Sequence, residues 1–535
     1  MTPTGPPFGR ILVANRGEIA VRIIRASHEL GMEAVAVYSD ADADAQHVRM
    51  ADIAIRLGPG PPSESYLRMD AIVAAALATG AEAIHPGYGF LSERAAFARA
   101  VEQAGLVFVG PPPTVIDALG DKIQARRLAR SVGVDGVPGS VDPVSVDRPD
   151  ALPAILAEAE RIGFPLLVKA TAGGGGRGMR RVATATELPA ALAAGSEEAA
   201  SAFGDGSVFL EREIRLGRHI EVQLLGDATG RVVAIGERDC SLQRRHQKLV
   251  EEAPAPGLTV GERGDLHERA VRLASAAGLQ NAATAEFLRA ADGAFYFLEV
   301  NTRLQVEHGV SELVSGVDIV QEQFRLAAGE PLSTAAMAAA DRATDPDDHA
   351  IEVRLSAEDP SRDFAPGPGR IRRWVMPAGP GVRVDTGFVA GDRVPPDYDN
   401  LVAKIMVYAG DRPTAIDRLR RALDETEVAG IQTTLPFHRF VARHDGFRTG
   451  EVSIEWVADE WDGAAERARY VEAAGEAAAR AVAGRTLGTA EPRPCPGPSA
   501  GPVSLGSRLG PALPAPAEGG WAAAARDEAV DRWPR

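Results

Sequence analysis

The sequence predicts a multidomain protein of mixed α/β and α+β class that begins with a Rossmann-like βαβ unit. Three observations support this prediction. The chain has 535 residues, which is too long for one hydrophobic core. Apolar runs alternate with helically spaced segments in its first part. Its middle part contains several strand-like runs with mixed spacing. We expect an N-terminal α/β domain at residues 8–120.

Composition excludes several classes of protein. The formal net charge of -16 argues against a general binder of nucleic acids or anionic membranes, because both need a positive field. The start "MTPTGPPFGR" does not resemble a targeting leader, and no stretch of about 18 residues is free of charge, so we expect a cytoplasmic protein. The two cysteines, Cys240 and Cys495, exclude a disulfide framework, and we interpret both as passive thiols.

The first unit, "RILVANRGEIAVRIIRASHELGMEAVAVYSDADAD", is typical of a strand, a turn, a helix ended by Gly31, and a second strand. Its first turn, "ANRGEIA", contains one glycine where a dinucleotide site needs three at fixed spacing. A nicotinamide cofactor is therefore disfavoured, and Asp40 at the end of the second strand is the one feature in its favour.

A second domain is expected at residues 121–330, where a glycine run stands out. Lys169 ends the strand "FPLLVKA", and the four glycines at 173–176 follow it, which reverses the order of a P-loop. We interpret the run as a mobile flap whose N–H groups reach a phosphate oxygen above Lys169. A flexible surface loop is the alternative.

Alternating polar residues follow the apolar run "AFYFL". The polar positions are Glu299, Asn301, Arg303, Gln305 and Glu307. Period two predicts an extended chain with these side chains on one face, either as a strip of functional groups or as the wet face of an edge strand. In an extended chain, the first and last would lie about 26 Å apart, so the strip should have two separate ends unless the chain bends and brings them together.

An Asp292-Gly293 pair before this strip predicts a two-residue hairpin turn. Such a turn places Glu286 opposite Glu299, where two carboxylates would repel each other unless a cation lies between them. With Asn301 on the same face as Glu299, this all-oxygen set suits Mg²⁺ or Mn²⁺. A three-residue loop would shift the register by one.

Cations cluster in "ERDCSLQRRHQKLVEEAPAP". Arg244, Arg245, His246 and Lys248 are close together in an acidic protein, as an anion pocket would require. A solvated charged surface is the alternative interpretation.

The C-terminal part completes the expected organisation. We interpret "STAAMAAADRATDPDDHA" as an acidic connector and residues 345–460 as a third domain with strands in "AIEVRLSAED", "RIRRWVMP" and "LVAKIMVYAG" and a helix in "TAIDRLRRALDET". Residues 461–535 start with an Ala-rich helical stretch and continue as a tail rich in Pro and Gly, which we expect to be disordered.

Taken together, "VANRGEIA", "IHPGYGFLSE", "GDK", the glycine run, "ERDCSLQRRHQKLVEEAPAP" and "EVNTRLQVEH" resemble biotin carboxylase, the ATP-grasp component of biotin-dependent carboxylases. The resemblance runs from about residue 8 to 458. It implies an ATP-grasp fold for the second domain and a biotin carboxylase lobe for the third. It also implies that bicarbonate attacks the γ-phosphate of MgATP to give carboxyphosphate, which then carboxylates N1′ of biotin.

The resemblance implies a role for each of a set of residues. ATP would contact Lys122, Lys169, the backbone of Gly175 and Gly176, Glu211, Arg212, Glu213, Ile214, His219, His246 and Leu288. One or two Mg²⁺ or Mn²⁺ ions would bind Glu286, Glu299 and Asn301. Bicarbonate would contact Lys248, Arg303, Gln305 and the backbone of Val306, with Glu307 as the base and Arg354 beside carboxyphosphate and biotin.

Two positions differ from the family pattern: Ala172 replaces the first glycine of the flap, and Gly309 replaces a common proline. The sequence has no Met-Lys pair of the kind that carries biotin. We therefore expect biotin on a separate carrier protein and a carboxyltransferase subunit of an acyl-CoA carboxylase as a further partner. A homodimer is expected as well, in keeping with the resemblance. An ATP-grasp ligase with another acceptor, and a catalytically silent nucleotide sensor or scaffold, are the alternatives.

Overall fold

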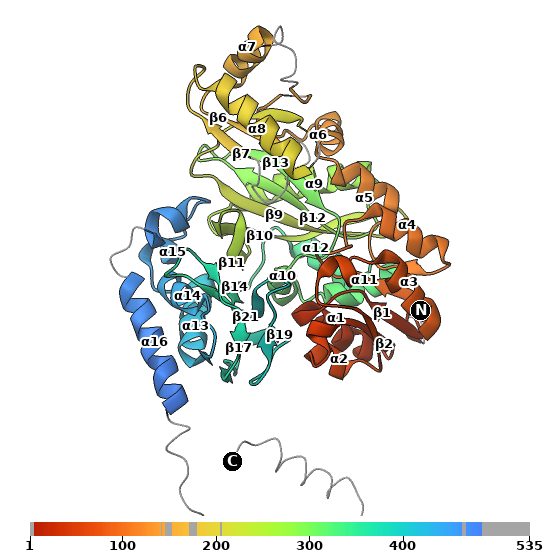
Figure 1. The fold of residues 1–535 in the computed structure, drawn as a ribbon. Helices are drawn as coiled ribbons and strands as arrows, with labels where there is room; N and C mark the ends of the chain where they lie inside the picture. Colours follow the sequence, from red (N-terminus) through yellow and green to blue (C-terminus); the bar gives the residue numbers. More distant parts are fainter. Residues whose placement is uncertain are drawn as a thin grey trace, which may run out of the picture. The chain divides into compact units, whose positions relative to one another are not determined.

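The computed structural model of the chain describes residues 5–140, 142–144, 152–170, 179–203, 206–462 and 467–483. Residues 1–486 form one compact unit, and the second unit, residues 487–535, lies outside the described part (Figure 1). No helix among the described residues is both long and apolar enough to cross a membrane.

The N-terminal part is a parallel five-stranded sheet in the order β3-β2-β1-β4-β5. Its strands are β1 (Arg10–Val13), β2 (Glu33–Ser39), β3 (Ile53–Gly58), β4 (Ala83–His85) and β5 (Val107–Phe108). The accompanying helices include α1 (Gly17–Glu29), α3 (Met69–Thr79), α4 (Ala95–Gln103) and α5 (Pro113–Gly120). This part confirms the α/β beginning that the sequence predicts, because every strand pair in this sheet is parallel.

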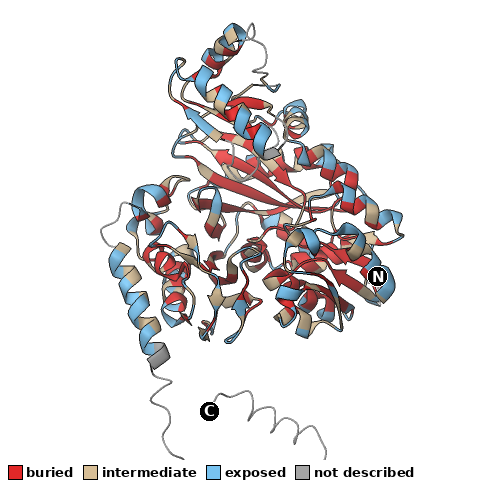
Figure 2. Cartoon of the chain, viewed as in Figure 1, coloured by how far each residue is buried: buried red, intermediate tan, exposed pale blue. Residues whose placement is uncertain are grey.

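An eight-stranded antiparallel sheet forms the centre, in the order β13-β12-β9-β10-β11-β14-β21-β19. Its strands are β9 (Arg218–Gly226), β10 (Val232–Arg244), β11 (Gln247–Ala253), β12 (Asn281–Arg289), β13 (Phe295–Asn301), β14 (His349–Ser356), β19 (Val382–Thr386) and β21 (Leu401–Ala409). Figure 2 shows that burial follows these strands.

The pairing of β11 with β14 matters for the site. Glu251 lies opposite Glu352, and Val250 opposite Val353, so one sheet continues from the second expected domain into the third. The sequence did not predict this pairing. It brings Arg354 into the same sheet as Lys248.

A smaller antiparallel sheet, in the order β7-β6-β8, carries the expected ATP contacts. It consists of β6 (Leu166–Ala170), β7 (Met179–Val182) and β8 (Val208–Arg212), with α7 (Leu152–Ile162) and α8 (Leu188–Phe203) packed on it. Helix α6 (Lys122–Ser131) begins at Lys122 because the Asp121 side chain accepts hydrogen bonds from the N–H groups of Ile123 and Gln124, both 2.9 Å long.

The expected acidic connector is wrong in part, because it contains helix α12 (Thr334–Arg342). The Ser333 hydroxyl caps this helix by accepting from the Ala336 N–H at 3.1 Å, and Ala336 and Ala339 pack into the N-terminal core. The acidic composition of the segment did not indicate that one face of a helix is buried there.

Four further helices contact strands of the central sheet: α9 (Val260–Ala276), α10 (His308–Ser315), α11 (Ile319–Ala327) and α13 (Arg412–Glu425). The other helices are α2 (Gln46–Met50) in the N-terminal part, and α14 (Leu435–Val441), α15 (Asp445–Thr449) and α16 (Arg467–Ala483) in the C-terminal part. The helix predicted in "TAIDRLRRALDET" is α13, and the Ala-rich stretch forms α16. The expected disorder of the tail concerns residues outside the described part.

Candidate active site

One large cavity, with a volume of about 740 Å³, lies where all three expected domains contribute side chains. Of the residues expected from the sequence, it is lined by Lys122, Lys169, Glu211, Arg212, Ile214, His219, His246, Lys248, Glu286, Leu288, Glu299, Asn301, Arg303, Gln305, Val306 and Arg354. Glu213 and Glu307 do not line it. Gly175 and Gly176, with Ala172, lie outside the described residues.

Glu286 on β12 lies opposite Glu299 on β13, as predicted, but for a different reason. The Ala290 N–H donates to the Ala294 carbonyl at 2.8 Å, so the loop has three residues and not the predicted two. That loop alone would shift the register by one. A β-bulge between Glu286 and Phe287 restores it, so the two deviations cancel.

The extended part of the strip ends at Asn301, the last residue of β13, so of the two courses left open by the sequence the chain takes the bent one. The chain then turns, and Glu307 becomes the N-cap residue of α10. This turn brings together the two ends that an extended chain would separate. Lys248 contacts both ends, because its Nζ donates to Glu286 at 3.0 Å and to Glu307 at 2.7 Å.

The expected metal end contains oxygen ligands of the right kind. Glu286 and Glu299 lie directly opposite each other, and the Glu299 side chain is 41% exposed and lines the cavity. Asn301 donates its amide to Glu286 at 2.8 Å and accepts from Arg303 at 2.9 Å. Two carboxylates and an amide beside a cavity fit a hard divalent cation that shares its coordination with a ligand.

Lys248 is the centre of a buried charge cluster. Its ammonium also donates to Glu221 on β9 at 2.5 Å, so three carboxylates surround it. Burial alone would lower the pKa of Lys248, but Glu221, Glu286 and Glu307 raise it well above its ordinary value. Lys248 therefore stays positively charged and is suited to holding an anion.

Glu221 is a site residue that the sequence analysis missed. It lies opposite Glu286 in the sheet and two residues after His219, so a strand places both on one face. The same period-two rule that identified Glu299 and Asn301 would have found it.

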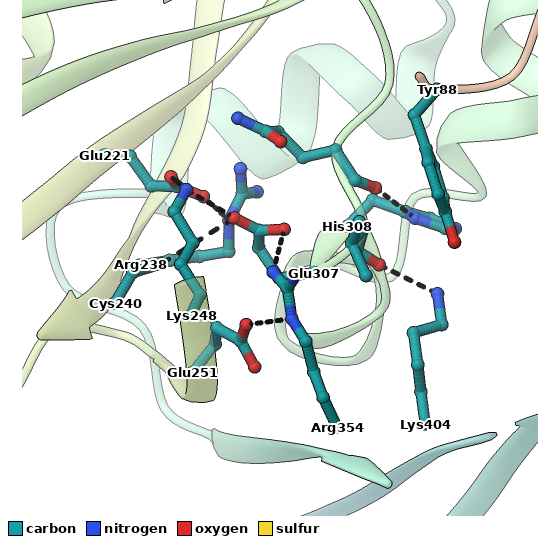
Figure 3. A network of polar contacts seen from close by, with 12 residues as sticks. Tyr88, Glu221, Arg238, Cys240, Lys248, Glu251, Glu307, His308, Arg354 and Lys404 are labelled. Carbon is teal, nitrogen blue, oxygen red and sulfur yellow. Dashed lines mark hydrogen bonds and ion pairs between the residues drawn. The ribbon is translucent and has the colours of Figure 1, made fainter. Parts of the chain in front are cut away.

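Glu307 is fully buried between two cations (Figure 3). One of its oxygens accepts from Lys248, and the other accepts from Arg354 at 2.9 Å. Burial alone would raise the pKa of Glu307, but the charges of Lys248 and Arg354 outweigh it and hold the pKa well below its usual range. Glu307 is therefore a carboxylate. Cys240 lies nearby with a buried thiol whose pKa burial raises well above normal, which agrees with a passive role.

Two arginines extend this end of the cavity. Arg303 donates to Glu93 at 2.8 Å and to Gln305 at 2.8 Å. Arg354 donates its Nε to Glu251 at 2.5 Å. Glu93 and Glu251 were not identified from the sequence, although both lie in the quoted motifs "IHPGYGFLSE" and "KLVEEAPAP".

The other end carries the residues expected to bind nucleotide. Lys169 and Arg126 both form ion pairs with the buried carboxylate of Glu211, and Lys122 lies 3.6 Å from Glu299. Burial alone would raise the pKa of Glu211, but the two cations lower it.

At the end of β8, the side chains of successive residues point in opposite directions. Arg212 donates to the Tyr296 hydroxyl at 3.1 Å, whereas Glu213 pairs with Arg181 at 2.8 Å and its side chain does not line the cavity. Burial alone would lower the pKa of His219, but its contact with Glu286, 3.0 Å between Nε2 and a carboxylate oxygen, raises it.

The predicted anion pocket from four clustered cations is wrong in part. Arg244 and Arg245 both form ion pairs with Asp363 and do not line the cavity, whereas His246 and Lys248 do. The turn of the β10–β11 hairpin lies at Arg245 and His246, both with positive φ, and it separates the directions of neighbouring side chains. Burial and the charge of Lys169 lower the pKa of His246.

Comparisons with known proteins match most of this chain to one family. Residues 7–116 match the family model "Biotin carboxylase, N-terminal domain", residues 121–335 match "Carbamoyl-phosphate synthase L chain, ATP binding domain", and residues 352–459 match "Biotin carboxylase C-terminal domain". The biotin carboxylase of Pseudomonas aeruginosa is 47% identical over 448 residues, covering 84% of this chain and 97% of that protein. The biotin carboxylase of Haemophilus influenzae is 46% identical over 448 residues, covering 84% of this chain and 98% of that one.

Solved structures give the same result. A complex of the Campylobacter jejuni biotin carboxylase with β,γ-ATP has a TM-score of 0.80 at 42% identity, covering 85% of this chain and 99% of that one. The biotin carboxylase domain dimer of Hydrogenobacter thermophilus 2-oxoglutarate carboxylase, bound to MgADP, ADP and bicarbonate, has a TM-score of 0.79 at 43% identity. It covers 84% of this chain and 97% of that one.

Proposed function

The chain belongs to the biotin carboxylase family, and we propose that the two ends of its cavity divide the ATP-dependent carboxylation of biotin between them. In this reaction a bicarbonate oxygen attacks the γ-phosphorus of ATP, the bond to ADP breaks, and carboxyphosphate forms. Carboxyphosphate releases CO₂ and phosphate, the released phosphate accepts the N1′ proton of biotin, and N1′ forms its new bond to CO₂.

The nucleotide end would hold ATP. Lys169 and Lys122, which line the cavity, would neutralise charge on the phosphate oxygens, with the backbone of Gly175 and Gly176 as further proposed phosphate contacts. The adenine side would be formed by the cavity-lining residues Glu211, Arg212, Ile214, His219, His246 and Leu288, together with the backbone of Glu213. Glu286, Glu299 and Asn301 would hold Mg²⁺ or Mn²⁺, which when bound neutralises charge on the ATP phosphates.

The bicarbonate end would use Lys248, Arg303, Gln305 and the backbone of Val306 to bind the anion, and Glu307 to accept its proton. The observation that carries this proposal is the position of Glu307, which is buried between Lys248 and Arg354. An anion that takes over hydrogen bonds from these two cations raises the pKa of Glu307 toward the range of a working base. Arg354 then remains beside the oxyanion that develops on biotin.

Biotin would be presented by a separate carrier protein, with a carboxyltransferase as second partner and a homodimer as the working form. The names of two relatives support a multisubunit assembly: "Biotin-dependent acyl-coenzyme A carboxylase alpha3 subunit" from Mycobacterium leprae and "Propionyl-CoA carboxylase alpha chain" from Ruegeria pomeroyi. The Hydrogenobacter domain is a dimer. The biotinylated protein that co-purifies with this chain would identify the carrier.

The test of the function is ADP release from MgATP with and without bicarbonate and free biotin. We expect release to require bicarbonate and to increase when biotin is added. Nucleotide binding without bicarbonate-dependent release would favour a sensor, and bicarbonate-dependent release that biotin leaves unchanged would favour another acceptor.

A further inference from the structure

Lysine is rare in this chain, and its four lysines gather around one site. Of 58 cationic residues, only Lys122, Lys169, Lys248 and Lys404 are lysine. The first three line the cavity. Arginine and lysine are not interchangeable, since an ammonium is a compact charge with three donors and a guanidinium is a planar fork. A guanidinium would therefore not reproduce the contacts of the ammonium at these four positions. Lys404 is the lysine to which the proposed reaction gives no role.

Lys404 lies directly beside the bicarbonate end. On β21 it is opposite Arg354 of β14 and Asp385 of β19 in the sheet. Its Nζ donates to the main-chain carbonyl of Val306 at 2.8 Å, which is the dashed line drawn from Lys404 in Figure 3. The Nζ also lies 3.4 Å from a carboxylate oxygen of Glu18. Thus Arg354 contacts the Glu307 side chain, and Lys404 contacts the main chain one residue earlier.

The surroundings of Lys404 keep it charged and fixed. Its side chain is fully buried, and Asp385 lies 3.8 Å from its Nζ. Burial alone would lower the pKa of Lys404, but Glu18, Glu352 and Asp385 raise it. One N–H of the ammonium bonds to the Val306 carbonyl, and the carboxylates of Glu18 and Asp385 lie within ion-pair distance of the nitrogen.

We propose that Lys404 is a positioning residue for bicarbonate binding. Its ammonium holds the peptide between Val306 and Glu307 in the orientation that anion binding and proton transfer need. The Val306 carbonyl belongs to the peptide group that carries the Glu307 N–H, so one hydrogen bond fixes both residues. The inference rests on the proposed assignment of bicarbonate to this end of the cavity. It assigns a role to a residue from the C-terminal part of the chain that does not line the cavity.

The test compares two variants, Lys404→Arg and Lys404→Met, with the control Arg412→Lys. The control replaces an arginine by a lysine at another buried position. Arg412 is a buried cation of the same C-terminal part, paired with Glu252 at 2.7 Å, and it does not line the cavity. In steady-state ADP release, we expect both Lys404 variants to raise the KM for bicarbonate by about tenfold or more. The KM for MgATP should change by less than about twofold, and Arg412→Lys should leave both KM values within about twofold.

Each outcome decides. An unchanged bicarbonate KM in Lys404→Arg overturns the inference, and so does an equal rise in both KM values, because a purely structural role would affect both substrates. If a single variant fails to fold, the double variant Lys404→Met/Glu352→Gln is assayed in the same way, because it removes one buried acid together with the lysine. If the double variant also fails to fold, the inference is overturned. A wild-type protein without bicarbonate-dependent ADP release would instead refute the proposed function before any variant is measured.

Discussion

Glu307→Gln removes the charge of the proposed base and changes little else in its shape. Glu307 accepts from Lys248 at 2.7 Å and from Arg354 at 2.9 Å. Lys248 keeps Glu221 and Glu286 in the variant, and Arg354 keeps Glu251, so neither cation is left without a carboxylate. One amide N–H will face a cation, which costs about 1–3 kcal/mol of stability. The fold should therefore persist.

The expected effect of Glu307→Gln is on the chemical step. Loss of a general base lowers rates by roughly 10²- to 10⁴-fold, which corresponds to about 3–5 kcal/mol in the activation free energy. Bicarbonate-dependent ADP release should fall by that factor, while the Kd for MgATP, measured by calorimetry, should stay within about threefold because the hydrogen-bond partners of Glu307, Lys248 and Arg354, belong to the bicarbonate end.

Glu251→Gln is the matched control, since it removes a carboxylate from the same Arg354 without removing the base. Its rate should fall by less than about tenfold. Equal losses in Glu251→Gln and Glu307→Gln would show that charge around Arg354, and not proton transfer, explains the effect. Lost MgATP affinity in Glu307→Gln would place this residue at the metal end and refute the division into two ends.

Three further predictions follow from other parts of the structure. Burial raises the pKa of Glu251 to about 7, so ionisation of this group lowers the free energy of unfolding as the pH rises from about 4.5 through 7. Between pH 4.5 and 8, the free energy of unfolding of Glu251→Gln should therefore increase by about 3 kcal/mol relative to the wild type in thermal unfolding. A difference that does not change with pH would contradict this. Glu299→Gln should raise the free Mg²⁺ needed for half-maximal ADP release by about tenfold or more, and an unchanged requirement would remove Glu299 from the metal site. Gly309→Ala should lower the free energy of unfolding by about 1–3 kcal/mol, because a Cβ there would lie 2.3 Å from the Met406 sulfur. Adding Met406→Ala to this variant should restore part of the loss, and strictly additive effects of the two substitutions would refute the contact.

Local sequence patterns were sufficient to locate much of the candidate site. The alternation at Glu299 and Asn301 reflects a real strand, and the carboxylate of Glu286 lies where cross-strand pairing places it. The alternation was misleading after Asn301, because period two also arises in a turning segment whose apolar residues are buried: Leu304 is fully buried although no strand is present there. The chain turns after Asn301 because helix α10 begins at His308, so the segment before it cannot continue as a strand.

Contacts between distant segments could not be predicted from local patterns. The pairing of β11 with β14 joins residues about a hundred positions apart, and neither strand carries a mark of its partner. Arg354 reaches Glu307, and Lys404 reaches Val306, only because of this pairing and that of β14 with β21. The scarcity of lysine was visible in the sequence, but its meaning for Lys404 depends on the contact with Val306.

The transfer of label from radioactive bicarbonate to biotin tests the central claim most directly. The purified chain is incubated with MgATP, labelled bicarbonate and biotin, and acid-labile label on biotin is compared with the ADP released. We expect label on biotin that depends on ATP, rises with ADP and is absent from Glu307→Gln. ADP release with no label on biotin at saturating bicarbonate would contradict the assignment of this cavity to biotin carboxylation.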